Sequence, residues 1–465
     1  MDTASVQFDA ANLLHRLDRS APSYASYPTA DRFVEAFSGQ DYAQALRQRQ
    51  HPVSAQVQPL ALYVHIPFCE SLCYFCKCNK VITGQHHRAA SYLQYLEREV
   101  DLHRAEIGSD QAVSHLHLGG GTPTYLSDDE LRVLMGMLRR SFRLATGGDC
   151  SIAVDPRTVD ATRISRLADL GFNRVSFGLQ DFDEAVQKAV HRVQSAEQVH
   201  AVVSAARRSG FTSVGVDLIC GLPRQSLESF NHTVAMVTEL RPDRIAMYAY
   251  DHSPLRFRPQ RHIVSAEVPP AATRHAMLSD ATQSLIRAGY VYMGMDDFAL
   301  PTDPLAVAKR QGRLSRSWNG YSSQPEGDMI GLGVSALGRI GATYSHNTRS
   351  VADYCDRLDQ GQFPVVRGLT LTRDDLLRRA VIMALMCQGQ LSFESIELSY
   401  LLDFPSYFEV EMAALQRLAQ QDLVMLNETG IYLTASGLLA LRRVAMVFDR
   451  HLQNDYSRAR FAQII

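Results

Sequence analysis

Residues 63–80 read YVHIPFCESLCYFCKCNK, and this stretch decides how the rest of the chain is interpreted. It begins inside an apolar run, 62–66, that has the composition of a β-strand. Three cysteines follow at C-x3-C-x2-C spacing: Cys69, Cys73 and Cys76. The same spacing would place them on one face of a helix. Pro67 and the position directly after a strand favour a loop instead, so we expect a loop wrapped around a bound group.

The type of group follows from the number of thiols. A structural zinc site takes four protein ligands and keeps no open position, and the ligands usually come as two separated pairs. The sequence shows no second pair of cysteines that would complete such a site. The irons of an iron–sulfur cluster normally take one cysteine each, so three cysteines on a [4Fe–4S] cluster leave one iron open to a cofactor or substrate. Cys78 could fill that position, but only one residue separates it from Cys76, which is sterically awkward. We predict a [4Fe–4S] cluster with an open iron, with zinc and buried structural thiols as the alternatives.

Outward from this loop, short apolar runs alternate with longer amphipathic segments. The strand-like runs are 62–66, 113–118, 151–154, 174–178, 213–219 and 245–250. Helix-like segments such as 91–105 and 128–142 lie between them. This alternation predicts right-handed βαβ crossovers and a parallel sheet. We predict an α/β fold in which residues 61–300 form a partial (β/α)6 TIM-like barrel rather than a complete eight-stranded one.

Three further segments flank the predicted barrel. Residues 1–60 read as an N-terminal arm rich in turn residues, and residues 301–370 as an irregular connecting segment that packs on the barrel. Residues 371–465 read as a mainly helical, winged-helix-like C-terminal domain with a hairpin at 423–434 and a closing helix at 435–452. This last domain holds nine Arg and eleven Asp or Glu, so a structural or lid role is favoured over DNA binding.

Composition excludes several classes of function. The 465 residues include 47 Lys or Arg and 49 Asp or Glu, a net charge of −2 that offers no general attraction for a polyanion. We expect no nucleic-acid partner. The first residues lack the apolar core of a secretory signal, and no apolar run reaches the ~18 residues needed to span a bilayer. We therefore expect a cytoplasmic monomer with no membrane association.

Polar and glycine-rich motifs recur where the predicted strands end. HLHLGGGTPTYL at 115–126 ends the second strand, and glycines there let the backbone approach a ligand closely. Gln180, Arg192 and Asp217 follow later strands. Each alone would be interpreted as a cap or turn residue, but the carboxyl ends of barrel strands meet on one face. Together they predict a pocket for a polar cofactor.

The cysteine spacing, with an aromatic before the last cysteine, resembles the radical S-adenosylmethionine (SAM) superfamily. Further motifs occur in order: SYASYPTA, YVHIPFC, CYFCKCNK, GGGTPTYL, VDPR, GFNRVSFGLQDF, GLP, GMDDFA and GLGVSA. With them the chain resembles the oxygen-independent coproporphyrinogen III oxidases over almost its whole length. The resemblance implies a [4Fe–4S] cluster and two SAM molecules. It also implies that an adenosyl radical abstracts hydrogen from two propionates of coproporphyrinogen III, which lose carbon dioxide to become the vinyl groups of protoporphyrinogen IX in haem biosynthesis.

The resemblance also implies roles for single residues. The cluster ligands would be Cys69, Cys73 and Cys76. The first SAM would be lined by Tyr63, Phe75, Gly120 and Leu337. The second would be held by Gly121, Thr122, Gln180, Arg192 and Asp217, with Asp251 where the family contributes a small residue. An electron donor such as a flavodoxin system would reduce the cluster.

Two positions depart from the family pattern. Ala153 in SIAVDPR stands where the motif has a Glu expected to hold the amino group of the first SAM, and Asp297 in GMDDF stands where His is usual. Loss of a charge-assisted hydrogen bond at Ala153 costs on the order of 1.5 to 3 kcal/mol, which would weaken activity. Two other interpretations stay open: a haem chaperone of the same superfamily, and a radical methyltransferase acting on a tetrapyrrole. The fourth cysteine, Cys78, and the Tyr-rich arm argue against the chaperone.

Overall fold

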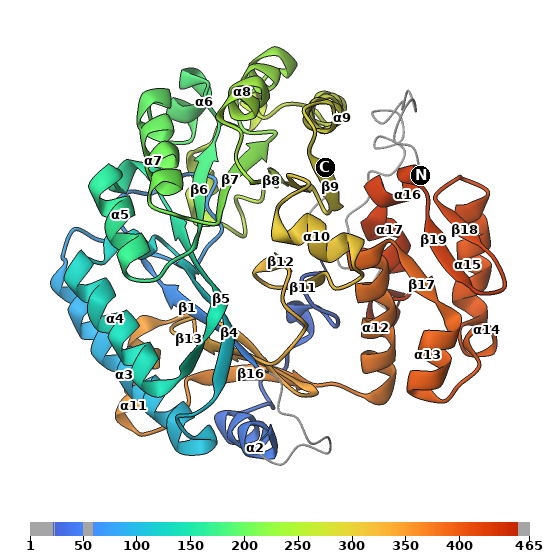
Figure 1. Cartoon of the computed structure of the whole chain (residues 1–465), viewed down its shortest axis with the longest axis horizontal. Coiled ribbons are helices and arrows are strands. Elements are labelled where there is room, and N and C mark those ends of the chain that lie inside the picture. Colours follow the sequence, from blue (N-terminus) through green and yellow to red (C-terminus); the bar gives the residue numbers. More distant parts are fainter. Residues whose placement is uncertain (1–21, 23, 50–58, 454–465) are drawn as a thin grey trace.

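A computed structural model describes residues 22, 24–49 and 59–453, which form a curved sheet wrapped by helices and a C-terminal domain beside it (Figure 1). The sheet has twelve strands in the order β16-β15-β14-β13-β1-β4-β5-β6-β7-β8-β10-β9. The two end strands do not pair with each other within the described ranges. The partial barrel predicted from the sequence is confirmed, because the sheet curls without closing.

Six parallel strands form the middle of this sheet, and the sequence predicts all six. They are β1 (Leu60–Ile66), β4 (Ala112–Gly120), β5 (Arg143–Val154), β6 (Arg174–Gln180), β7 (Ser213–Cys220) and β8 (Arg244–Ala249). Most of them differ from their predicted bounds by a residue or two. The exception is β5, which begins eight residues earlier than the predicted run at 151–154. Its first half, RLATGG, is polar and largely exposed and therefore lacks an apolar signal.

Helices cover the outer face of these strands (Figure 1). They are α3 (His87–Ile107), α4 (Asp128–Ser141), α5 (Ala161–Asp169), α6 (Glu184–Ala189), α7 (Ala196–Arg208), α8 (Leu227–Leu240) and α9 (Ala271–Arg287). The starts of α4 to α8 carry side-chain caps; in α4, Ser127 and Glu130 form a reciprocal capping box. Leu62, Val64 and Ile66 of β1 are fully buried. Because strand side chains alternate, Tyr63 and His65 face the concave side.

Residues 301–370, expected to be irregular, contain a helix, α10 (Pro304–Arg310), and most of the remaining sheet. β13 (Met329–Leu332) runs parallel to β1, and it is followed by antiparallel β14 (Leu337–Ile340), β15 (Thr343–Asn347) and β16 (Val365–Thr370). The other edge is formed by β10 (Asp297–Ala299) and β9 (Val291–Gly294). These strands are short and interrupted by glycine: a Cβ on Gly331 would lie 2.3 Å from Leu337 O. Such brief segments carry too little alternation to be read from sequence.

Two more elements complete this region. The hairpin of β11 (Ser315–Ser317) and β12 (Gly320–Ser322) lies in the open mouth of the sheet, toward the C-terminal domain (Figure 1). Helix α11 (Val351–Asp359) packs on the outer side against α3. The hairpin therefore fills part of the opening between the two edges of the unclosed sheet.

The described part of the N-terminal arm links the two main bodies. Helix α2 (Gly39–Arg49) packs against α3, although the arm is too polar in sequence to be a core element. Tyr24 and Tyr27 are fully buried in the hydrophobic core of the C-terminal domain. The Tyr24 hydroxyl donates to Asp449 Oδ2 at 2.9 Å. Residues 1–21 and 50–58 of the predicted arm lie outside the described residues.

The C-terminal domain combines helices with a small three-stranded sheet. Its elements are α12 (Arg373–Gln388), β17 (Gln390–Ser392), α13 (Phe393–Tyr400), α14 (Phe404–Tyr407), α15 (Glu409–Ala419), β18 (Val424–Leu426), β19 (Gly430–Leu433), α16 (Ala435–Leu439), α17 (Leu441–Met446) and α18 (Arg450–Gln453). The predicted hairpin is confirmed as β18 and β19. The predicted single closing helix is wrong, because it is broken into α16, α17 and α18. No helix among the described residues is long and apolar enough to cross a bilayer.

Candidate active site

The cysteine loop leaves the carboxyl end of β1 and is fastened at both ends. Its first residues form β2 (Phe68–Cys69), which pairs with β3 (Val81–Ile82) where the loop returns. The residues between them form turns and bends, so the alternative of a helical stripe is excluded. Cys69 and Cys73 are buried, Cys76 is half-buried and Cys78 is exposed. The three predicted ligands therefore lie on one compact loop at the strand ends.

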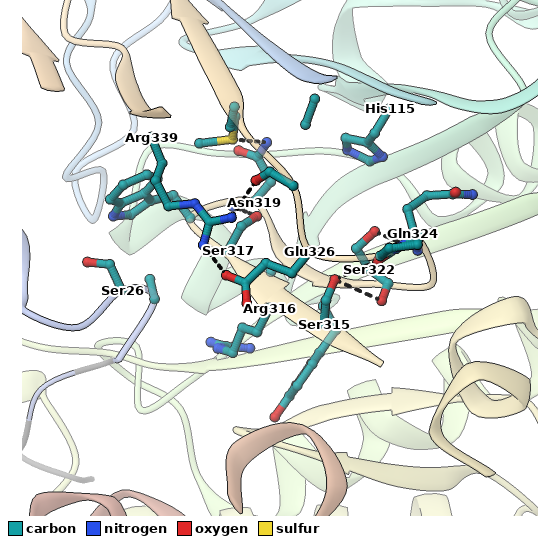
Figure 2. A pocket seen from close by; sticks show the side chains of 18 of the residues that line it. Ser26, His115, Ser315, Arg316, Ser317, Asn319, Ser322, Gln324, Glu326 and Arg339 are labelled. Atoms are coloured by element: carbon teal, nitrogen blue, oxygen red, sulfur yellow. Dashed lines mark hydrogen bonds and ion pairs between the residues drawn. The ribbon is translucent and has the colours of Figure 1, made fainter. Parts of the chain in front are cut away.

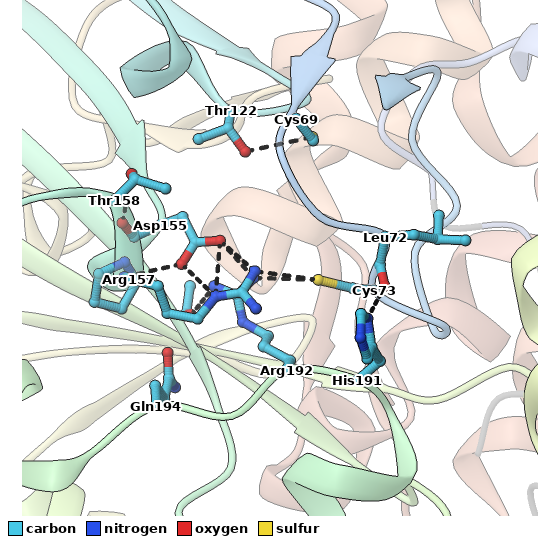
Figure 3. A network of polar contacts seen from close by, with 12 residues as sticks. Cys69, Leu72, Cys73, Thr122, Asp155, Arg157, Thr158, His191, Arg192 and Gln194 are labelled. Carbon is cyan, nitrogen blue, oxygen red and sulfur yellow. Dashed lines mark hydrogen bonds and ion pairs between the residues drawn. The ribbon is translucent and has the colours of Figure 1, made fainter. Parts of the chain in front are cut away.

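Polar side chains from later strands point at two of these sulfurs (Figure 3). Thr122 Oγ1 donates to Cys69 Sγ at 3.4 Å. Arg192 Nη1 donates to Cys73 Sγ at 3.4 Å, and Arg157 Nη2 does so at 3.6 Å. Burial raises the pKa of the Cys69 thiol to about 11, so its thiolate form requires positive charge nearby. A bound cluster would supply that charge.

Asp155 organises both guanidinium groups beside the loop (Figure 3). Its carboxylate pairs with Arg192 at 3.0 Å and with Arg157 at 2.7 Å, and all three side chains are largely buried. Asp155 follows the end of β5, and its side chain caps the short turn at Pro156–Thr158. Asp155 and Arg157 belong to the VDPR motif, to which the sequence alone assigned no role. The sequence signal that could have found Asp155 is its position at the end of a predicted strand.

The glycine motif packs directly on the cysteine loop. A Cβ on Gly121 would lie 2.7 Å from Pro67 O and 2.8 Å from Phe68 O, which no other residue could accommodate without a backbone shift. Gly121 N donates to Ile66 O at 2.8 Å. Gly120 has φ +112° and lies against the His65 ring. The three glycines therefore permit close approach of two loops, as predicted for this position.

Gln180, Arg192 and Asp217 come together at the ends of β6 and β7. A Cβ on Gly178 would lie 2.9 Å from Gln180 Nε2 and 3.1 Å from Arg192 Nη2. Both side chains therefore lie over Gly178, close to each other. Asp217 accepts a hydrogen bond from Ser176 Oγ at 3.0 Å, and burial raises its pKa to about 6. Within the described part of the chain, Gln180 Oε1 and Arg192 Nε are buried without a hydrogen-bond partner. Such atoms fit a polar cofactor that would satisfy them.

Tyr63 lies on β1 just before the cysteine loop, and Phe75 lies within the loop between Cys73 and Cys76. The Tyr63 hydroxyl is 3.0 Å from His65 Nδ1, and its ring stacks on His117 with centroids 5.9 Å apart. Phe75 packs against a small apolar cluster that includes Ile219. Both side chains are therefore held in place by packing near the cysteines.

Asp251 and Leu337 have firm contacts of their own. Asp251 Oδ2 accepts from Lys77 Nζ at 2.7 Å, which ties the end of β8 to the cysteine loop. Leu337 packs in an apolar cluster with Phe33 and Tyr344, next to the N-terminal arm. Its strand, β14, is separated from β1 by β13. Leu337 thus packs two strands away from β1, on which the cysteine loop begins.

Ala153 lies on β5 two residues before Asp155, and it pairs in register with Ser176 of β6. It is half-buried and faces the same concave side of the sheet as the residues above. A carboxylate at this position would therefore have pointed into the predicted cofactor pocket.

Cys78 lies beside Cys76, and their side chains are hydrogen-bonded. This contact lowers the pKa of Cys76 to about 6 and raises that of Cys78. Lys80 Nζ donates to the carbonyls of both residues, at 3.1 and 3.3 Å. The cysteines are not drawn together around a single point, since no group of three or more His, Cys, Asp or Glu among residues 22, 24–49 and 59–453 is gathered as for one metal ion. Cluster ligands need no such convergence, because each thiolate binds a different iron.

Comparison with known proteins agrees with this geometry. The Radical SAM superfamily model matches residues 63–237, and the HemN C-terminal domain model matches residues 371–440. The chain is 45% identical to oxygen-independent coproporphyrinogen III oxidase of Pseudomonas aeruginosa over 99% of both chains. It is 42% identical to the enzyme of the same name from Escherichia coli over the full length of both.

The chain belongs to the oxygen-independent coproporphyrinogen III oxidase family. The solved structure of coproporphyrinogen III oxidase from Escherichia coli, described as a radical SAM enzyme, matches with a TM-score of 0.88 at 44% identity. The match covers 92% of this chain and 97% of that one. Family membership implies a [4Fe–4S] cluster and SAM. The free thiols, the cationic side chains beside them and the unpartnered polar atoms of this chain fit both groups.

Proposed function

We propose that this protein catalyses the oxidative decarboxylation of two propionate side chains of coproporphyrinogen III to vinyl groups, giving protoporphyrinogen IX in haem biosynthesis. The observation that carries the proposal is the full-length similarity to enzymes named for this substrate, at 42 to 45% identity. The arrangement of the site also supports it, because one end of the sheet holds the three thiols, the glycine loop and the side chains of Gln180, Arg192 and Asp217. The reaction removes a hydrogen atom, an electron and carbon dioxide from each propionate.

Particular residues would hold the cofactors. Cys69, Cys73 and Cys76 would ligate the [4Fe–4S] cluster, and two SAM molecules would bind beside it. The first would be lined by Tyr63, Phe75, Gly120 and Leu337. The second would be held by Gly121, Thr122, Gln180, Arg192, Asp217 and Asp251. The cluster and SAM supply a 5′-deoxyadenosyl radical when bound.

The chain's own contribution is positioning and charge. Arg157 and Arg192 place positive charge beside the Cys73 sulfur, and Asp155 holds both guanidinium groups in place. Arg192 and Gln180 also offer a donor and an acceptor for the polar groups of SAM. The buried carboxyl of Asp217 would accept a hydrogen bond from the second SAM. The fixed backbone around Gly121 keeps the two loops in register and leaves little room for water.

An acidic electron-transfer protein such as a flavodoxin would dock on the loop that follows β8. Arg256, Arg258 and Arg261 are exposed on this loop. Gln260 Nε2 donates to Phe75 O at 3.3 Å, so the loop touches the cysteine segment. A positive surface near the cluster would steer an acidic partner and give an association rate that falls steeply with salt.

Several finer expectations accompany this function. We propose that the enzyme works in the cytoplasm as a monomer, with neither nucleic acid nor membrane as a partner. We also propose four functional units: an arm at 1–60, a barrel at 61–300, a connecting segment at 301–370 and a C-terminal domain at 371–465. The C-terminal domain would serve as a structural or lid element.

The test is an anaerobic assay of the reconstituted protein with SAM, a reductant and coproporphyrinogen III. We expect carbon dioxide and a product lighter than the substrate by two carboxyl groups and two hydrogen atoms. A product of increased mass would identify a methyltransferase. Tight binding of haem with no carbon dioxide released would identify a chaperone. Either outcome would overturn the proposal.

A further inference from the structure

A cavity lined by the first residues of β1 and β4 lies at the opposite end of these strands from the cysteine loop. Figure 2 shows side chains that surround it. It is bounded by the β11–β12 hairpin, the first residues of β1, and β4 at His115. Arg339 of β14 and Arg379 of α12 complete its wall. From His115 to Gly120 the strand advances about 17 Å. The cavity is therefore separated from the glycine loop by a distance that a tetrapyrrole and its side chains could span.

Arg316 is a lining residue whose hydrogen bonding is incomplete. Its side chain is only 10% exposed, yet its Nε has no hydrogen-bond partner among the described residues. The guanidinium lies over the Tyr321 ring at 4.6 Å, which fixes its plane. Its Nη1 forms a long ion pair with Asp297 Oδ2, at 3.5 Å. A buried cation with a free donor and a long ion pair can bind another anion.

The other charges around the cavity leave it positive. Arg339 and Arg379 both pair with a single carboxylate, Glu326. Burial raises the pKa of Asp297 to about 7, so the partner of Arg316 is only partly ionised near neutrality. Among the residues that line the cavity, three are arginines (Arg316, Arg339 and Arg379) and one carries a carboxylate, Glu326. This excess of positive charge favours an anionic ligand.

The cavity has the size of one short side arm. Its volume is about 70 Å³. A single water needs about 10 to 15 Å³ on the same measure, so the space holds about five to seven water-sized atoms. A propionate arm, CH2–CH2–COO−, has five non-hydrogen atoms. The macrocycle itself would lie outside, in the open concave side of the sheet.

We propose that Arg316 binds the carboxylate of a propionate that the reaction leaves intact. The inference rests on the proposed function, in which two of four propionates react. The reacting arms must lie at the cysteine end of the strands. The cavity is lined by the first residues of β1 and β4, Ala61 and His115, at the opposite strand ends, so an arm that fills it is not one of the reacting pair. Arg316 would then set which pair of propionates is presented to the radical, so it is a binding and orienting residue.

The test compares Arg316→Gln with the wild type in fluorescence titrations with coproporphyrin III and with protoporphyrin IX, the stable oxidised forms of substrate and product. We expect the Kd for both ligands to rise about 10- to 100-fold, because both retain the propionate that Arg316 holds. Arg316→Lys keeps the charge and should retain part of the affinity. Arg313→Gln is the matched control, since the exposed Arg313 side chain hydrogen-bonds to Gln311, away from the cavity lining. The iron content and SAM cleavage without substrate should be unchanged in all variants.

The outcomes separate this inference from the function on which it rests. Equal Kd values for wild type and Arg316→Gln would overturn the role of Arg316, even if the wild type forms vinyl product. Weaker binding of coproporphyrin III alone would mean that Arg316 holds a reacting arm, which also contradicts the inference. If Arg316→Gln does not fold, the wild type decides: equal affinity for coproporphyrin III and its tetramethyl ester would exclude carboxylate recognition. A wild type that binds both ligands yet releases no carbon dioxide would refute the function only.

Discussion

Restoring a carboxylate at Ala153 should tighten SAM binding. Ala153→Glu places an acid on the concave face of β5, half-buried and in register with Ser176. A charge-assisted hydrogen bond to the amino group of SAM contributes about 1.5 to 3 kcal/mol, equivalent to about 10- to 100-fold in Kd. The new charge would lie about 7 Å from Asp155, and repulsion at that distance is about 2 kcal/mol at an effective dielectric constant of 20. Arg157 and Arg192 already neutralise Asp155, so most of this repulsion is offset.

Calorimetric titration of the anaerobically reconstituted protein with SAM measures the effect. Ala145→Glu, at the exposed end of the same strand, is the matched control and should leave the Kd unchanged. We expect the binding of the two SAM molecules to respond differently, with only the first SAM gaining affinity. The reasoning fails if Ala153→Glu binds SAM with the affinity of the wild type while remaining folded.

Three further changes test other parts of the account. Gly121→Ala forces a Cβ against Pro67 O, so it should destabilise the cysteine loop by about 1 to 3 kcal/mol and lower the iron retained after reconstitution; full iron content would contradict the close approach. Arg192→Gln should reduce bound SAM from two molecules to one in equilibrium dialysis, whereas two in the variant would remove Arg192 from that site. Burial raises the pKa of Glu99 from 4.5 to about 7, so the folded state keeps this proton to a higher pH than the unfolded state does. The free energy of unfolding therefore falls as the pH rises from 4.5 to 7. Urea titrations across this range should show that fall reduced by up to about 3 kcal/mol in Glu99→Gln, and an unaltered pH dependence would show that Glu99 does not titrate as proposed.

The barrel strands could be predicted because their apolar residues form continuous runs between clear helices. The cysteine loop could also be predicted, since Pro67 and the strand before it exclude a helix. The strands after residue 300 could not, because glycines such as Gly331 and Gly338 replace the alternating side chains and act through backbone contacts. The sequence likewise gives no sign that Tyr24 is buried against Asp449, a partner 425 positions away.

The site shows the same division. Residues at strand ends, such as Gln180 and Asp217, could be grouped because topology brings strand ends together. Asp155 was missed because its role depends on two arginines from different loops. Arg316 could not be singled out among the 47 Lys and Arg of the chain until its burial and its unpartnered Nε were known.

Mössbauer spectroscopy of anaerobically reconstituted protein, with and without SAM, tests the central claim most directly. We predict four irons per chain in a cubane, with one iron whose signal changes when SAM is added because no protein ligand holds it. Serine at any one of Cys69, Cys73 or Cys76 should abolish this spectrum, while Cys78→Ser should keep it. A mononuclear iron signal, or four irons unaffected by SAM in the wild type, would contradict the account.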